Sequence, residues 1–239
     1  MNRSGIRARG AASRTIFPPR RNPKGRWLVA ALIAGALLCA GGLGLLSTAT
    51  DRPVAADRTD SEAWQLVLVN ATHPLPEDHL VETVELDGGE SVDARIEEPL
   101  SELFRAAEQA GYHPFVRSGY RTRAEQERVL AERIAYYEDQ GLGEQAAQQE
   151  ASRWVAQPGT SEHELGLAVD INDEDGDEEL YAWLDVHAHE YGFIKRYPED
   201  ASQITGISHE PWHYRYVGTE AARDIYLGDL TLEEYLGAV

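Results

Sequence analysis

An uncharged, apolar segment near the N-terminus constrains the fold of this chain more than any other feature. Residues 27–46 read WLVAALIAGALLCAGGLGLL and contain no charged side chain. About 20 apolar residues are what an α-helix needs to cross the hydrocarbon core of a bilayer. We therefore predict a separate N-terminal transmembrane helix over residues 27–47. The alternative is a cleaved signal peptide, but the apolar core of such a peptide usually spans only about 7–15 residues.

The regions on either side of this segment differ sharply in charge. Residues 1–26, a basic leader, hold 8 of the 22 Lys and Arg residues and no Asp or Glu. The positive-inside rule then places the leader in the cytoplasm and the rest of this single-pass membrane protein outside the cytoplasm. The other 14 basic residues stand against 41 Asp and Glu residues, a formal charge of −27. Such an acidic surface repels nucleic acid, so we expect no nucleic-acid partner.

The cysteine content limits the kind of metal site that the chain can build. Cys39 is the only cysteine, and it lies inside the apolar segment. One cysteine can form neither an internal disulfide nor a thiolate-rich zinc site. Any bound metal would therefore be held by His and carboxylate side chains.

A linker and one folded domain are predicted after the apolar segment. Residues 48–63 show no periodicity and are typical of a linker, so we predict the domain over residues 64–239. Apolar spacing in the domain predicts helices over 96–110, 123–139, 143–155 and 177–191. Runs of apolar, β-branched and aromatic residues predict strands over 65–70, 113–116, 165–171, 193–197 and 207–217. Because helices and strands do not alternate regularly, we predict an α+β fold with a small antiparallel sheet flanked by helices.

Residue types that suit a metal site are concentrated in three segments that lie far apart in the sequence: residues 161–170, residues 209–213 and, upstream of both, Tyr120 and Arg121. A catalytic zinc takes about three protein ligands and leaves one position for water. His163, Asp170 and His213 could supply two nitrogens and one oxygen. With one anionic ligand, the metal keeps a net positive charge and can acidify its water and polarise a peptide carbonyl. Glu210, close to His213, could take the proton from that water.

Residues 209–213 also match the H-E-x-x-H zinc signature literally. In that signature both His residues bind zinc from one face of a helix, but Pro211 in the middle would break such a helix. The aromatic neighbours favour a strand instead. On a strand, Glu210 would point away from His213 unless a bend redirected it. Spacing alone therefore leaves the roles of His209 and Glu210 open.

Three motifs together carry a resemblance to a known family. They are S-G-Y-R-T at 118–122, S-x-H-x-x-G-x-A-x-D at 161–170 and E-P-W-H-Y-R-Y-V-G at 210–218. In order and spacing they resemble the VanY-type D-alanyl-D-alanine carboxypeptidases, from a zinc peptidase superfamily shared with lysostaphin and the hedgehog signalling domain. The resemblance covers about residues 64–236, so the leader and the apolar segment lie outside it.

The resemblance implies a role for each of five residues. His163, Asp170 and His213 would bind Zn²⁺ on the small sheet, Glu210 would be the catalytic acid/base, and Arg121 would steady the carbonyl oxygen as negative charge develops. Zinc-bound water would attack the last peptide carbonyl, and Glu210 would pass the proton to the departing D-Ala amine.

Other positions in or near the motifs are weaker candidates. Those proposed for substrate binding are Ser118, Tyr120, Gln126 and Ser161. A turn former, a core aromatic and two capping or helix-surface residues would explain them as well. His209 is not a metal ligand in the family's pattern, which makes the H-E-x-x-H match accidental.

The resemblance also implies a substrate. The chain would remove the C-terminal D-Ala from peptidoglycan stem peptides in a bacterium. One rival keeps the zinc site but cuts another bond, as a D,D-dipeptidase or an L-Ala-D-Glu endopeptidase would. A second rival is a non-catalytic cell-wall-binding domain.

An acidic run follows the second motif. Residues 170–179 read DINDEDGDEE, which has the carboxylates of a calcium-binding loop. The glycine that such a loop needs at its sixth position comes one residue late, at Gly176. We therefore expect a solvated acidic loop at 172–179.

Overall fold

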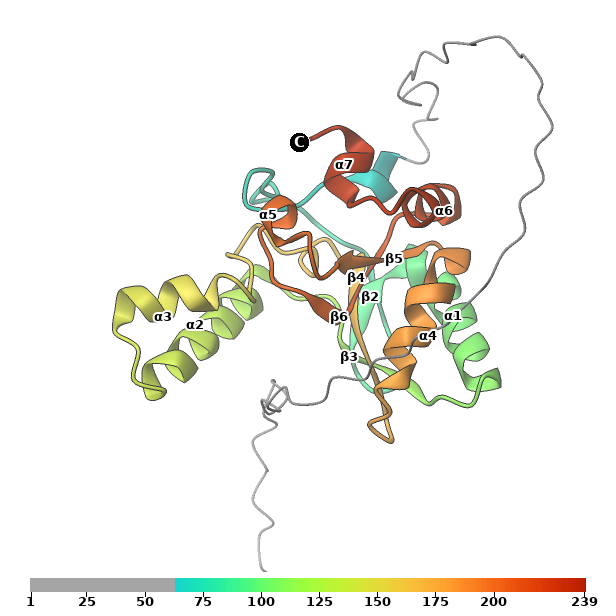
Figure 1. Ribbon diagram of the computed structural model, residues 1–239, viewed down its shortest axis with the longest axis horizontal. Coiled ribbons are helices and arrows are strands. Elements are labelled where there is room, and N and C mark those ends of the chain that lie inside the picture. The colour runs from blue at the N-terminus through green and yellow to red at the C-terminus, as the bar shows by residue number, and fades with distance from the viewer. Residues whose placement is uncertain (1–62) are drawn as a thin grey trace, which may run out of the picture. The chain divides into compact units, whose positions relative to one another are not determined.

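The computed structural model describes residues 63–239 (Figure 1). The basic leader, the predicted transmembrane segment and all but the last residue of the predicted linker lie outside the described residues. Among residues 63–239, no helix is long and apolar enough to span a bilayer. The membrane anchor therefore stays a prediction.

A four-stranded antiparallel sheet forms the centre of the domain (Figure 1). In order across the sheet, its strands are β3 (Pro114–Ser118), β4 (Ala168–Asp173), β6 (Glu210–Tyr216) and β5 (Phe193–Tyr197). All neighbouring pairs are antiparallel. Four of the five predicted strands are confirmed, and so is the mixed α+β class.

The register of this sheet aligns residues from all three motifs. Asp170 of β4 lies opposite Ser118 of β3 and opposite His213 of β6. Side chains alternate along a strand, so Val169 and Tyr214 point to the other face, where both are fully buried. One face of the sheet therefore carries polar residues and the other carries the core.

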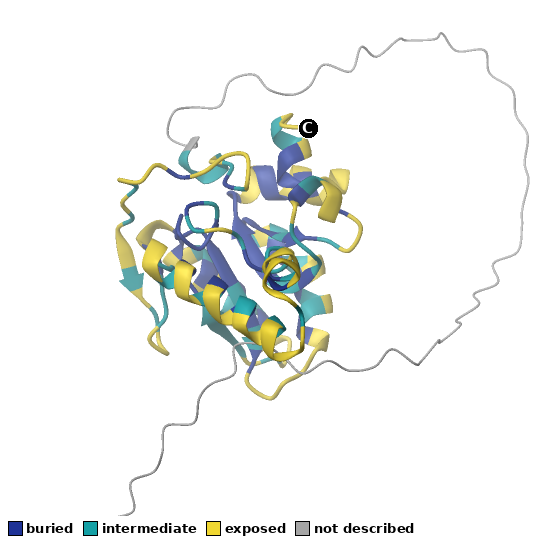
Figure 2. Cartoon of the chain, turned by 90° about the vertical axis from the view of Figure 1, so that its left-hand side faces the viewer, coloured by how far each residue is buried: buried dark blue, intermediate teal, exposed yellow. Residues whose placement is uncertain are grey.

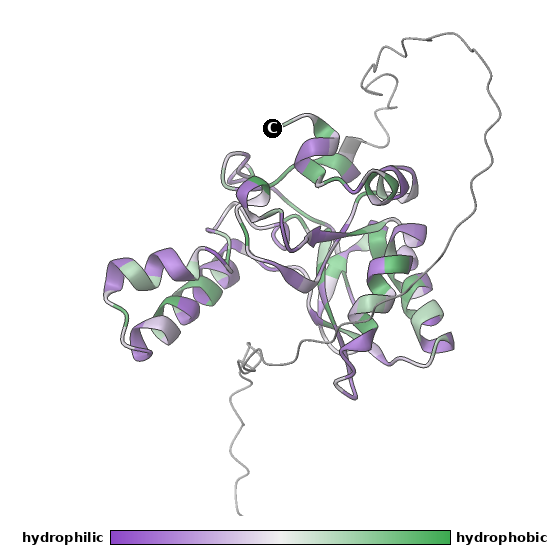
Figure 3. Cartoon of the chain, viewed as in Figure 1, coloured by the Kyte–Doolittle hydropathy of each residue, from purple (hydrophilic) through white to green (hydrophobic). Residues whose placement is uncertain are grey.

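Two helices, α1 (Glu97–Gln109) and α4 (Glu179–His187), pack on the apolar face. Leu103 of α1 and Leu184 of α4 are buried in the same cluster as Ile171 of β4. Figure 3 shows hydrophobic residues along both helices, and Figure 2 shows that the strands of the central sheet are buried. Both helices lie within the ranges predicted from apolar spacing.

A helical hairpin of α2 (Arg123–Asp139) and α3 (Glu144–Ala151) projects from the sheet (Figure 1). A capping box begins α2: the Thr122 hydroxyl accepts from the Glu125 N–H, and the Glu125 carboxylate accepts from the Thr122 N–H. Figure 2 shows that much of α2 is exposed. Thr122, the last residue of the first motif, therefore also fixes the start of a helix.

The predicted strand over residues 65–70 is wrong. The chain forms a 3-10 helix, η1 (Ala63–Leu66), and then an irregular segment. The carbonyl groups of Gln65 and Val67 each accept a hydrogen bond of 2.9 Å from Nη2 of Arg215. Because a buried side chain satisfies these groups, no neighbouring strand is needed.

Several short elements were not predicted. They are the hairpin β1 (Thr83–Glu85) and β2 (Ser91–Asp93), the 3-10 helix η2 (Ala94–Ile96), and the helices α5 (Ser202–Thr205), α6 (Thr219–Gly228) and α7 (Leu232–Leu236). The helix predicted over 177–191 is divided into α4 and a 3-10 helix, η3 (Ala188–Tyr191). Ile225 of α6 and Leu232 of α7 pack against Ile194 of β5 in a second hydrophobic cluster. The C-terminal helices thus cover one edge of the sheet.

Candidate functional site

The three predicted metal ligands lie together. Asp170 and His213 come from neighbouring strands, and His163 comes from the turn that precedes β4. Their ligand atoms all lie within 4.8 Å of one another. Oδ1 of Asp170 is 3.2 Å from Nδ1 of His213 and 3.5 Å from Nε2 of His163. The two imidazole rings are perpendicular, with centroids 4.9 Å apart.

The surroundings of these atoms fit a metal ion. Both imidazoles are buried, and Oδ1 of Asp170 is buried without a hydrogen-bond partner. A buried carboxylate oxygen with no partner is costly unless a cation or a donor meets it. Two imidazole nitrogens and one carboxylate oxygen form a donor set that zinc prefers, and they leave a position for water.

Neighbouring groups set the orientation of each imidazole. Nδ1 of His163 donates to the carbonyl oxygen of Gly119 at 2.7 Å, which leaves Nε2 for the metal. The backbone N–H of Arg121 donates in turn to the His163 carbonyl at 3.1 Å. In His213, Nδ1 faces the cluster and Nε2 lies 3.5 Å from Oε2 of Glu162. The two His residues therefore offer different ring nitrogens to the site.

Gly119 occupies a position that no larger residue can fill. A Cβ added there would overlap the carbonyl oxygen of Ser91. Ser91 also accepts a hydrogen bond from the backbone N–H of Tyr120, so its carbonyl is fixed in place. The first motif therefore needs glycine because its backbone packs directly against β2.

We expect Gly119→Ala to lower the free energy of unfolding by about 1–3 kcal/mol through this overlap. Zinc binding should weaken too, because the carbonyl that orients His163 must move. Denaturant unfolding and zinc titration of the purified variant measure the two effects. Gly143→Ala is the matched control, since an added Cβ there meets open space. Equal stability of the two variants would contradict the prediction.

Glu210 is also part of the cluster. Its Oε2 lies 3.7 Å from Nδ1 of His213. The pairing of β5 with β6 shifts between Lys195 and Tyr197, and this irregularity falls beside Glu210. A bulge of this kind re-aims a side chain, which explains why Glu210 does not point away as strict alternation would require.

The pKa values of these buried groups are strongly shifted. Burial, with the nearby Asp170 carboxylate adding to it, raises the pKa of Glu210 to about 8 against the opposing effect of His213. Burial lowers the pKa of His163 to about 4, with Arg121 adding to the effect. Burial also lowers the pKa of His213, but Asp170 and Glu162 outweigh it and raise this pKa to about 9. A cation among the ligands would lower all three pKa values.

Arg121 is held on three sides. Its Nε donates to the Ser118 hydroxyl at 2.9 Å, Nη1 donates to Oε1 of Gln126 at 3.0 Å, and Nη2 lies 3.3 Å from Oδ2 of Asp170. The Gln126 amide is fixed by donating to the Ala156 carbonyl at 2.7 Å. The structure thus places two of the predicted substrate-binding residues, Ser118 and Gln126, against the guanidinium.

The other weak candidates are placed differently. Ser161 is buried at the start of the turn, where its carbonyl accepts from the Glu164 N–H at 3.1 Å. Tyr120 is half-buried. Nδ1 of His209 donates to the Tyr197 carbonyl at 2.9 Å, and His209 is not among the clustered ligands of the described residues.

Two residues near the cluster were not anticipated from the sequence. Glu162 is fully buried beside His213, and the ring of Tyr197 packs on His213 with centroids 4.7 Å apart. A Glu in a loop is normally assigned to the surface, so only its position next to His163 could have drawn attention to it. Tyr197 comes from a separate strand, and nothing in its local sequence marks it.

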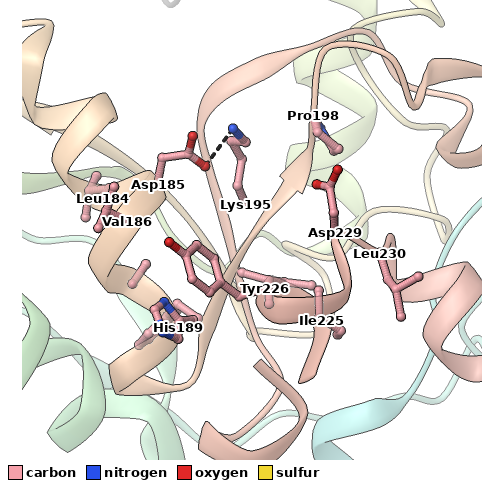
Figure 4. Close-up of a pocket in the computed structure, with 13 residues that line it drawn as sticks. Leu184, Asp185, Val186, His189, Lys195, Pro198, Ile225, Tyr226, Asp229 and Leu230 are labelled. Carbon is pink, nitrogen blue, oxygen red and sulfur yellow. Dashed lines mark ion pairs between the residues drawn. The ribbon is translucent and has the colours of Figure 1, made fainter. Parts of the chain in front are cut away.

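A cavity of about 240 Å³ lies between α4, β5 and α6 (Figure 4). Lys195 and Asp185, two of its lining residues, form an ion pair of 2.6 Å. His189 and Tyr226 stack there with ring centroids 3.8 Å apart. None of the predicted site residues lines this cavity. The cavity is therefore distinct from the ligand cluster.

Comparisons with known proteins point to one family. Residues 89–219 match a family model described as VanY: D-alanyl-D-alanine carboxypeptidase. A D-alanyl-D-alanine carboxypeptidase of Enterococcus faecalis is 50% identical over 186 residues, which cover 76% of this chain and 69% of that protein.

Solved structures agree with this match. A structure of VanYB in complex with D-alanine-D-alanine is 50% identical, with a TM-score of 0.71 over 73% of this chain and 98% of that chain. A mutant of the vancomycin resistance D,D-pentapeptidase VanY in complex with Zn(II) is also 50% identical, with a TM-score of 0.71 over 72% of this chain and 99% of that chain.

Proposed function

This chain belongs to the VanY family of D-alanyl-D-alanine carboxypeptidases, and from that membership we propose that His163, Asp170 and His213 hold its catalytic zinc. The protein is a zinc-dependent D-alanyl-D-alanine carboxypeptidase. One observation supports this ligand set above the others. The buried Oδ1 of Asp170 has no hydrogen-bond partner and lies between a nitrogen of each imidazole.

The remaining polar groups have separate tasks in the proposed reaction. Zinc, when bound, supplies a Lewis acid that acidifies water and polarises the scissile carbonyl. Glu210 takes a proton from the attacking water and gives it to the D-Ala amine that leaves. Arg121 donates N–H groups to the carbonyl oxygen as negative charge develops on it. Ser118 and Gln126 act through Arg121, because both accept hydrogen bonds from its guanidinium.

The proposed substrate is a peptidoglycan stem peptide that ends in D-Ala-D-Ala. A relative that is 50% identical is described in complex with D-alanine-D-alanine, which supports this choice. Hydrolysis would release the terminal D-Ala and leave a stem peptide one residue shorter.

Product analysis tests this function. The full-length chain is incubated with zinc and a pentapeptide ending in D-Ala-D-Ala, and the products are identified by mass spectrometry. We expect release of single D-Ala, which a chelator stops and added zinc restores. Release of a dipeptide alone, or no cleavage by the zinc-loaded protein, would contradict the proposal.

We propose in addition that residues 27–47 anchor the domain to a membrane, with the leader in the cytoplasm and the catalytic domain outside it. The uncharged stretch of 27–46 and the basic residues before it support this placement. The full-length chain is expected to stay in the membrane pellet after an alkaline wash, whereas a chain lacking residues 1–47 is expected in the supernatant. Protease added to spheroplasts should digest the domain. Full-length chain in the wash supernatant would refute the anchor.

A further inference from the structure

Four buried charged side chains lie behind the ligand cluster. They are Glu162 of the turn, Arg196 of β5, Arg215 of β6 and Glu233 of α7. None of these side chains is more than 2% exposed. Two cations balance two anions, so the group as a whole carries no net charge. Buried ions are tolerated only when they are paired and hydrogen-bonded in this way.

The contacts within the group are short and directional. Oε1 of Glu162 accepts from Nε of Arg196 at 2.9 Å and from Nη1 of Arg215 at 2.8 Å. Arg196 uses its other two nitrogens for the carboxylate of Glu233, at 2.9 and 2.6 Å. Glu162 is therefore held through one of its two oxygens.

The second oxygen of Glu162 faces a metal ligand. Oε2 of Glu162 and Nε2 of His213 are both buried, and neither has a hydrogen-bond partner. They lie 3.5 Å apart. An acceptor and a ring nitrogen that face each other with no other partner are complementary only if the nitrogen carries a proton. The proton of a neutral His213 then sits on Nε2, and the lone pair of Nδ1 faces the ligand cluster.

The group also extends beyond the residues that match the family model. That match covers residues 89–219, whereas Glu233 lies after it. Asn70, which lies before it, donates to Oε1 of Glu233 at 3.1 Å. Nη2 of Arg215 donates to the carbonyl groups of Gln65 and Val67. Segments at both ends of the domain therefore fix the two arginines that hold Glu162.

We propose that Glu162 is a positioning residue for zinc, which fixes the ring and tautomer of His213 while the paired arginines hold Glu162 itself. The inference rests on the proposed ligand set. A carboxylate on the far nitrogen of a ligating imidazole orients the ring and makes it a stronger ligand. The zinc affinity of this protein is then set partly by a residue that does not touch the metal.

Zinc affinity, measured by competition with a chromophoric chelator on the full-length chain, tests the proposal. Glu162→Gln is expected to bind zinc about 10–100-fold more weakly, the usual effect of losing such an outer partner. The matched control is Glu164→Gln. Glu164 is a second buried carboxylate of the same turn, and it accepts from the Gly159 N–H and pairs with Arg123. The control is expected to bind zinc as the parent does.

A second variant shows whether weaker zinc binding comes from the lost orientation of His213 or from damage to the fold. Glu162→Gln leaves two buried guanidinium groups with one carboxylate, so its fold is checked by circular dichroism. Glu162→Asp keeps the charge but shortens the side chain, and we expect it to fold as the parent does and still bind zinc more weakly. Nitrogen-detected NMR of the histidine rings should show the proton of zinc-bound His213 on Nε2.

Two results would overturn the inference. One is parental zinc affinity in folded Glu162→Gln and Glu162→Asp, and the other is equal weakening in Glu162→Gln and Glu164→Gln. Both leave the proposed function intact if the parent binds zinc and releases D-Ala. Failure of the parent itself to bind zinc would instead refute the ligand set.

Discussion

Replacement of Glu210 by Gln is expected to lower kcat for D-Ala release by about 10²–10⁴-fold, the range that general acid–base catalysis contributes. The amide has nearly the volume of the carboxylate but can neither take the proton from water nor return it to the leaving amine. Because Oε2 of Glu210 lies 3.7 Å from a ring nitrogen of His213, the side chain is close to the ligands without being needed to complete the set. Zinc should therefore stay bound.

Steady-state kinetics and zinc content, measured on the same preparation, distinguish this role from others. Glu220→Gln, an exposed change on α6, is the control and should turn over as the parent does. A Glu210→Gln protein with parental kcat would show that Glu210 is not the acid/base. Loss of zinc from that variant would make Glu210 a ligand instead.

Asp170→Asn is expected to weaken zinc binding by more than about 100-fold, since the loss of an outer partner alone costs about 10–100-fold. The change removes the one anionic ligand of the proposed set. It also removes the charge opposite Nη2 of Arg121, 3.3 Å from the carboxylate. Activity should fall with the metal, because the Lewis acid is lost and the guanidinium is no longer held on that side.

Asp173→Asn is the control for this substitution. Asp173 is a second buried carboxylate on β4, and it accepts from the backbone N–H groups of His113 at 2.7 Å and Asp175 at 2.8 Å. We expect this variant to lose stability but to keep zinc affinity. Chelator competition and denaturant unfolding measure the two quantities. Zinc binding by Asp170→Asn as tight as that of the parent would refute the ligand assignment.

The parts of the structure that depend on interactions between near neighbours in the chain could be predicted from the sequence. Apolar spacing located α1, α2 and α4, because a helix is stabilised by contacts between residues three or four positions apart. Thr122 and Glu125 mark the start of α2 through a capping box. The metal-ligating residue types, in motifs of fixed order, predicted a cluster that the sheet register does bring together.

The wrong prediction for residues 65–70 and the question left open for Glu210 both concern contacts that the local sequence does not determine. The segment 65–70 has the composition of a strand, but its carbonyl groups meet Arg215, about 150 residues away, and so it forms no ladder. The side of β6 on which Glu210 lies depends on a bulge, which composition does not reveal. Local propensity carries no information about either contact.

The sequence by itself determined which residue types were available for a zinc site, how the motifs are spaced, and where the principal helices lie, since these depend on near neighbours. Only the tertiary structure decided what each side chain contacts. It turned Ser118 and Gln126 toward Arg121, and it buried Glu162 behind His213. The physical reason is that hydrogen bonds and burial are satisfied by whatever group the fold brings near, and that group can come from any part of the chain.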